Sequence, residues 1–215
     1  MRLREGLSDR DAFRQVWLDR HLDPVVLGAP FNWKKIHTVV DIGAHIGMFT
    51  LFAAANAPSA RVIALEPEQQ NYRVLLGNVE RNNLGNRITA LQIGVGNGKP
   101  MTLYTFGADR GGDSVYRKNE GGSPIMIQTM SIGEVLRKYG IASCDLLRLN
   151  CQGAEYEALY ETSLEDLQRI NSMIIDYHHF CDNPTHSPDY LEEFLTKRGF
   201  RVARPESSML FACRS

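Results

Sequence analysis

Thr38-Val39-Val40-Asp41-Ile42-Gly43-Ala44-His45-Ile46-Gly47 joins a short β-branched run to a turn bounded by two glycines. Residues 38–42 predict a buried strand, because β-branched side chains favour strands and a strand covered on both faces is apolar. The segment from Met48 to Ala57 predicts a helix after the turn. A strand, a glycine turn and a helix in this order begin a βαβ unit, which indicates a parallel sheet.

Short apolar runs and helical patterns continue to alternate along the chain. We expect further strands at residues 61–65, 88–93, 145–149 and 173–176. We expect helices beginning at Pro67, after the capping-box pair Ser131 and Glu134, at Ala154 and at Tyr190. Residues 201–203 and 209–212 are expected to form a C-terminal antiparallel hairpin. The predicted fold is α/β, a doubly wound, mostly parallel, Rossmann-like sheet with helices on both faces.

Two segments do not follow this alternation of strands and helices. Residues 1–35 form a helical lead-in, with a helix that Asp23-Pro24 ends. The glycine-rich residues 107–122 lie between two strand-like runs and are expected to form a loop or lid. No internal repeat or linker divides the chain, so we expect one domain over residues 1–215.

Length and composition exclude several classes of protein. The chain has 215 residues, 43% of them hydrophobic, which suits a globular domain rather than a disordered one. No apolar run is long enough to span a bilayer, and the N-terminus lacks the apolar core of a signal peptide. A net charge of -1 argues against a nucleic-acid partner. The four cysteines show no C-x-x-C spacing, which favours free thiols in the cytoplasm. Oligomeric state is not predicted.

The turn after the first strand predicts a cofactor site, because doubly wound sheets bind ligands at the carboxyl ends of their strands. A dinucleotide fingerprint would carry a central glycine, and this turn does not. Asp41 would repel a pyrophosphate, but a carboxylate suits a ligand with an ammonium or a sulfonium. S-adenosylmethionine has both groups. The predicted contacts of this loop are Asp41, Gly43, Ala44, His45 and Gly47.

The second predicted contact is Glu66, at the end of the next strand. A carboxylate in that place accepts hydrogen bonds from ribose hydroxyls. Nicotinamide enzymes share this feature, so Glu66 alone does not discriminate between the cofactors. Pro67 follows it, and Gly94 and Val95 close the third strand and are expected to border the adenine. The missing central glycine disfavours a nicotinamide oxidoreductase.

Four segments in this order resemble the FkbM-type methyltransferases. They are residues 39–50, the run Ala64-Leu65-Glu66-Pro67 with Leu75, Asn78 and Asn82, residues 145–155, and the run Ile174-Ile175-Asp176-Tyr177-His178. The resemblance implies a class I methyltransferase fold and S-adenosylmethionine as cofactor. It also implies O-methylation of a hydroxyl on a small molecule, a glycan or a lipid.

The chain departs from the family pattern mainly at one strand end. Asn150 and Gln152 stand where the family carries Asp and Glu, and Asp176 replaces a Glu. Arg148 and His45 stand where Lys and Asn are usual. Asn150 cannot act as a base, but its amide can orient the substrate or the methionine end of the cofactor. The alternative function is therefore a protein that binds S-adenosylmethionine but has altered or lost acceptor chemistry.

His178 is the first candidate for a general base, because it follows the last core strand and histidine is the side chain that most often transfers protons in catalysis. The alternative is an ordinary loop histidine. Glu155 is expected to serve the N-terminus of the following helix. Residues 178–186 are rich in His and Cys, but their spacing matches no zinc signature, so no metal site is predicted.

Overall fold

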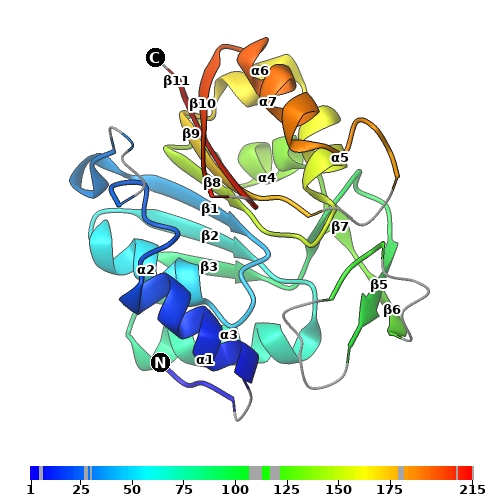
Figure 1. Cartoon of the computed structure of the whole chain (residues 1–215). Coiled ribbons are helices and arrows are strands. Elements are labelled where there is room, and N and C mark those ends of the chain that lie inside the picture. The colour runs from blue at the N-terminus through cyan, green and yellow to red at the C-terminus, as the bar shows by residue number, and fades with distance from the viewer. Residues whose placement is uncertain are drawn as a thin grey trace.

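The computed structural model describes residues 1–4, 7–26, 29, 31–106, 113–116, 122–178, 182–206 and 208–214. A seven-stranded sheet in the order β10-β11-β9-β8-β1-β2-β3 forms its centre (Figure 1). Its strands are β1 (Thr38–Ile42), β2 (Arg61–Leu65), β3 (Ile88–Leu91), β8 (Leu146–Leu149), β9 (Ser172–Asp176), β10 (Phe200–Glu206) and β11 (Met209–Arg214).

The pairing of these strands confirms the predicted topology. Strands β3, β2, β1, β8 and β9 pair in parallel, whereas β11 pairs antiparallel to both β9 and β10. The strand order reverses direction at β1, which has β2 on one side and β8 on the other. Ligands bind in doubly wound sheets at such a switch point, outside the carboxyl ends of the strands.

Helices cover both faces of the sheet, as predicted (Figure 1). Val40 and Ile42 of β1 contribute to the core on one face and Val39 to the core on the other, because successive strand residues point to opposite faces. The first core packs against α4 (Ile132–Lys138), α5 (Glu155–Tyr160), α6 (Leu164–Gln168) and α7 (Pro188–Thr196). The second packs against α2 (Met48–Asn56), α3 (Gln69–Arg81), η1 (Arg14–Leu18) and η2 (Trp33–Lys35).

Two short sheets lie beside the main one. Strand β4 (Gly94–Val95) pairs in parallel with β7 (Thr129–Met130), and β5 (Met101–Thr105) pairs antiparallel with β6 (Ser123–Ile127). The strand predicted over residues 88–93 ends at Leu91, and Gly94 and Val95, which were expected to close it, form a strand of a different sheet. Most of the predicted glycine-rich lid, residues 107–112 and 117–121, lies outside the described residues.

Three predicted helices have different bounds. The lead-in helix does not continue to Asp23: α1 (Leu7–Phe13) passes into the π-helix η1, and Arg20, at φ +55°, ends the helical path. Pro67 is not a first helical residue, because Glu68 caps α3 by accepting a hydrogen bond from the backbone N–H of Asn71. The helix predicted from Ala154 is two helices, because Ser163 starts α6 as a cap.

The described helices include none long and apolar enough to cross a membrane.

Candidate functional site

A cavity of about 400 Å³ lies at the carboxyl ends of the central strands. Its size falls in the usual range for a small-molecule site. Nine of the predicted site residues line it: Gly43, Ala44, His45, Glu66, Pro67, Gly94, Val95, Asn150 and His178. The two other predicted residues, Asp41 and Gly47, are not among the residues that line it. The cavity therefore unites the predicted cofactor and acceptor positions.

The glycines of the β1–α2 turn are required by the chain itself. Gly43 has φ +78°, and a Cβ there would lie 1.9 Å from the carbonyl oxygen of Asn150. Gly47 has φ +90°, and a Cβ there would lie 2.6 Å from Leu75 Cδ1. Only glycine fits such backbone without strain. The two glycines thus let the β8 end and α3 pack closely against the β1–α2 turn.

Asp41 is fully buried, and both oxygens of its carboxylate accept hydrogen bonds from other side chains. Its Oδ1 accepts a hydrogen bond from Arg148 Nη1 at 3.1 Å, and its Oδ2 accepts one from Thr50 Oγ1 at 2.5 Å. The same Arg148 nitrogen donates to the carbonyl of Gly43 at 3.0 Å. Asp41 thus holds an arginine that fixes the β1–α2 turn.

Arg148 extends this pair into a triad. Its Nη2 lies 3.4 Å from Asp176 Oδ2, and its guanidinium lies 5.5 Å from the centre of the Phe49 ring. Burial disfavours the charge, but Asp41 and Asp176 outweigh it and raise the pKa of Arg148. Burial raises the pKa of Asp176 despite the neighbouring cation. Arg148 and Asp176 both line the cavity, so one wall carries a paired charge.

Glu66 lies at the β2 end of the cavity and is 6% exposed. Its Oε2 accepts a hydrogen bond from the backbone N–H of His45 at 2.8 Å. Its Oε1 accepts one from the backbone N–H of Glu68 at 3.0 Å and one from Asn71 Nδ2 at 3.3 Å. Burial nevertheless raises the pKa of Glu66 to about 7. A carboxyl fixed in this way has a set orientation and a protonation state that changes near neutral pH.

Glu155, the first residue of α5, plays a similar part in the loop after β8, although it does not itself line the cavity. It is fully buried, and its two oxygens accept hydrogen bonds from the backbone N–H groups of Cys151, at 2.9 Å, and Gly153, at 2.7 Å. Gln152, between them, has φ +52°. Glu155 therefore holds the loop after β8 in a conformation that non-glycine residues seldom adopt.

The same carboxylate also contacts His178. Glu155 Oε1 lies 2.9 Å from His178 Nδ1. Since Glu155 accepts, His178 donates from Nδ1, which directs Nε2 away from the carboxylate. Both residues could be singled out from the sequence, but the contact between them could not. The only signal was topological, because β8 and β9 are neighbouring parallel strands whose carboxyl ends meet.

The two amides that replace the family's acids lie beside this pair. Gln152 Nε2 donates a hydrogen bond to Asn150 Oδ1 at 3.3 Å, and both side chains line the cavity. Cys151 also lines it, but burial and the charge of Glu155 raise its pKa well above the ordinary value. This thiol therefore stays protonated and is a poor nucleophile.

His186, at the end of the histidine-rich run, takes part in a packing cluster. Its Nε2 lies 3.1 Å from Glu157 Oε1, its ring stacks on Tyr156, and Tyr116 also bonds Glu157. His179 and Cys181 of that run lie outside the described residues. Within the described part of the chain, no three His, Cys, Asp or Glu side chains form a group that could hold a metal.

Comparison with known proteins identifies the type of domain. Residues 41–202 match the model of the methyltransferase FkbM domain. Methyltransferase sdnD of Sordaria araneosa is 25% identical over 196 residues, which are 77% of this chain and 74% of that protein. The 31-O-demethyl-FK506 methyltransferase FkbM of Streptomyces tacrolimicus is 25% identical over 194 residues, covering 77% and 73%.

A solved structure supports the fold. The methyltransferase FkbM of Methylobacillus flagellatus superposes with a TM-score of 0.55 at 18% identity, over 93% of this chain. The chain spans 47% of that protein's length. The class I methyltransferase fold predicted from the sequence is confirmed.

Proposed function

This chain belongs to the FkbM methyltransferase family, and on that premise we propose that it transfers a methyl group from S-adenosylmethionine to a hydroxyl oxygen. One observation carries the proposal. A single cavity joins Glu66, a carboxyl suited to ribose, to His178, a histidine oriented by a buried carboxylate.

The cofactor half of the cavity fits a nucleoside. Glu66 has oxygens oriented by backbone N–H groups, which suits them to accept the two ribose hydroxyls. Apolar side chains and small residues border the space beyond it: Pro67, Ile93, Gly94, Val95 and Ile127. A flat adenine ring suits such a lining.

S-adenosylmethionine, when bound, supplies a methyl group made electrophilic by its sulfonium. The chain then has to align the acceptor and take its proton. We assign proton removal to His178 Nε2. Glu155 accepts from Nδ1–H, which fixes the tautomer and stabilises the imidazolium that forms, in the manner of a histidine–carboxylate pair. Asn150 and Gln152 would orient the acceptor hydroxyl without competing for its proton.

The name of a relative supports an oxygen acceptor. That name, 31-O-demethyl-FK506 methyltransferase, indicates that the relative's methyl group goes to an oxygen. We propose a hydroxyl on a small molecule, a glycan or a lipid as acceptor for this chain. We further propose that residues 1–215 act as one methyltransferase domain.

The test is a transfer assay. The protein is incubated with S-adenosylmethionine and a panel of natural-product, glycan and lipid alcohols, and products are identified by mass spectrometry. We expect a methyl ether from at least one class and S-adenosylhomocysteine in equal amount. Binding of the cofactor with no transfer to any alcohol of the panel would favour the alternative, a binding protein. The observation that favours this alternative is the amide pair Asn150 and Gln152, which stands where the family carries acids.

A further inference from the structure

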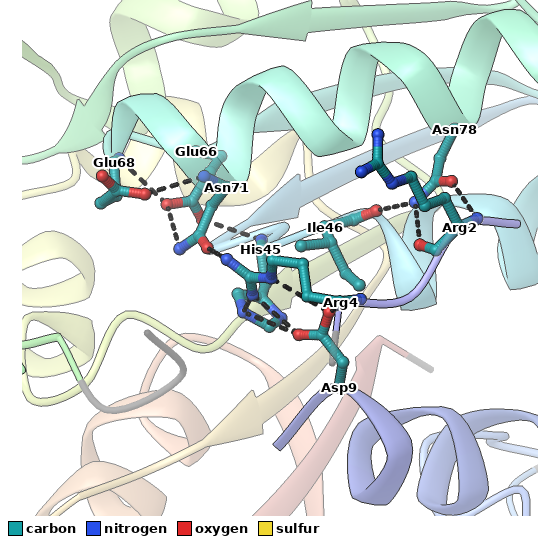
Figure 2. A network of polar contacts seen from close by, with 9 residues as sticks. All are labelled: Arg2, Arg4, Asp9, His45, Ile46, Glu66, Glu68, Asn71 and Asn78. Carbon is teal, nitrogen blue, oxygen red and sulfur yellow. Dashed lines mark hydrogen bonds and ion pairs between the residues drawn. The ribbon is translucent and has the colours of Figure 1, made fainter. Parts of the chain in front are cut away.

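The N-terminal segment is tied to the cofactor loop by Arg4. Its Nη1 donates to Asn71 Oδ1 at 2.7 Å, and its Nη2 lies 2.7 Å from His45 Nε2 (Figure 2). The Arg4 side chain is 23% exposed, whereas Asn71 is 2% exposed. Arg4 thus reaches from the start of the chain, more than 40 residues away in sequence, to the edge of the cofactor site.

Both contacts lead to Glu66. Asn71 accepts from Arg4 through Oδ1 and donates through Nδ2 to Glu66 Oε1. The backbone N–H of His45 donates to Glu66 Oε2 while its ring meets Arg4. Arginine can only donate, so a hydrogen bond between Arg4 Nη2 and His45 uses the lone pair of Nε2. Arg4 therefore fixes the orientation of two groups that each bond one oxygen of Glu66.

Asp9 holds Arg4 in this position. Its carboxylate, 2% exposed, accepts from Arg4 Nε at 3.0 Å and from Nη2 at 2.7 Å. Burial would raise the pKa of Asp9, but the hydrogen bonds and charge of Arg4 outweigh it and lower the pKa. A planar fork that bonds a carboxylate with two nitrogens and keeps a third for Asn71 is a geometry that lysine cannot reproduce.

A second contact anchors the same segment. The backbone of Arg2 bonds both ends of the Asn78 amide, and Asn78 Nδ2 also donates to the carbonyl of Ile46 (Figure 2). Downstream residues of the lead-in line the cavity: Ala12, Gln15, Val16, His21 and Leu22. The segment that carries Arg4 therefore also forms one wall of the site.

We propose that Arg4 is a positioning residue for the cofactor, which acts through His45 and Asn71 to hold Glu66 in its ribose-binding orientation. This inference rests on the proposed function, because it takes Glu66 as the ribose ligand. It couples the lead-in to the cofactor: an ordered lead-in supports Glu66, and a bound ribose stabilises the lead-in in return.

The test is a double-mutant cycle on S-adenosylhomocysteine affinity, measured by calorimetry. Arg4→Gln is expected to raise Kd about tenfold, and Arg4→Lys is expected to recover only part of the loss. In a Glu66→Gln background, Arg4→Gln should raise Kd less than about twofold, because the residue it acts through is already changed. Arg10→Gln, an equal charge change on the exposed face of α1, is the control and should leave Kd unchanged.

Kinetics and hydrogen exchange give two further readouts. Arg4→Gln should raise KM for S-adenosylmethionine and leave kcat unchanged. Ligand should slow exchange in residues 7–18 of the wild type and have little effect in Arg4→Gln. Equal losses of affinity in both backgrounds, or an Arg4→Gln variant that binds as the wild type does, would overturn the inference. A wild type that binds no ligand at all would instead refute the proposed function on which it rests.

Discussion

Glu66 lines the cavity directly, whereas Glu155 begins α5 and reaches the cavity through His178. Each is buried, and each accepts hydrogen bonds from two backbone N–H groups, those of His45 and Glu68 for Glu66 and those of Cys151 and Gly153 for Glu155. They differ in the remaining partner. Glu155 contacts the imidazole of His178, whereas Glu66 contacts an amide, Asn71, that Arg4 orients. The same device, a buried carboxylate that fixes a loop, thus supports a histidine at one end and a candidate ligand site at the other.

The difference separates catalysis from binding. Changes at the Glu155 end should alter turnover, because His178 is the proposed base. Changes at the Glu66 end should alter cofactor affinity.

Replacing the base should have the largest effect. His178→Ala is expected to lower kcat by about 10²–10⁴-fold, because proton removal by a positioned side chain contributes that much. The dissociation constant for S-adenosylhomocysteine should stay the same. His37→Ala, an exposed histidine outside the cavity, is the control. Undiminished methyl transfer by His178→Ala would remove His178 as the base.

Neutralising the residue behind the base should have a smaller effect. Glu155→Gln keeps the shape and the histidine but weakens the acceptor for Nδ1–H, so we expect kcat to fall by about 10–100-fold. The loop amides also lose a charged acceptor, which should lower the free energy of unfolding by about 1–3 kcal/mol. Glu161→Gln, an exposed residue just after α5, serves as the matched control. A stable variant with unchanged kcat would contradict the paired role.

The Glu66 end should respond to pH. Burial raises its pKa to about 7, so the carboxyl is protonated below that value and ionised above it. The ionised form accepts from both ribose hydroxyls, so affinity for S-adenosylhomocysteine should rise as pH increases through about 7. The slope should be at most about tenfold per pH unit. Glu66→Gln should remove it, and a slope that persists in that variant would assign the titration to another group.

The stability of the unliganded protein should depend on pH in the opposite direction from cofactor affinity. The pKa of Glu66 in the fold lies above its ordinary value, so the fold binds a proton more tightly than the unfolded chain does. Its contribution to stability is present at acidic pH and is lost as pH rises through about 7. Chemical denaturation of wild type and Glu66→Gln, compared on both sides of this value, measures the contribution.

Restoring the family's acids should have the smallest effect. Asn150→Asp combined with Gln152→Glu places charge beside the acceptor position, and we expect kcat to change a few-fold while cofactor affinity changes less. Asn150→Ser with Gln152→Ser, which removes the amides without adding charge, is the comparison. If turnover and affinity both stay the same in the acidic variant, these positions do not belong to the acceptor site.

Most of the sheet was predictable from sequence, because alternating apolar segments determine which elements are strands and which are helices. The carboxyl ends of the strands then identified the candidate cofactor residues. The network around them was not predictable. Arg148 binds Asp41 across paired strands, and Glu155 meets His178 only because β8 and β9 are neighbours. The role of Arg4 depends on the path of the lead-in, whose change from α- to π-helix has no periodic signal.

We propose above all that the cavity binds the nucleoside of S-adenosylmethionine through Glu66. The most direct measurement is calorimetric titration of S-adenosylhomocysteine into the wild type and into Glu66→Ala. We predict one site in the wild type and a loss of about 10–100-fold in the variant, since hydrogen bonds to a charged group are worth about 1.5–3 kcal/mol. Asp41→Ala should also weaken binding, through Arg148. No binding by the wild type, or equal affinity in Glu66→Ala, would contradict the claim.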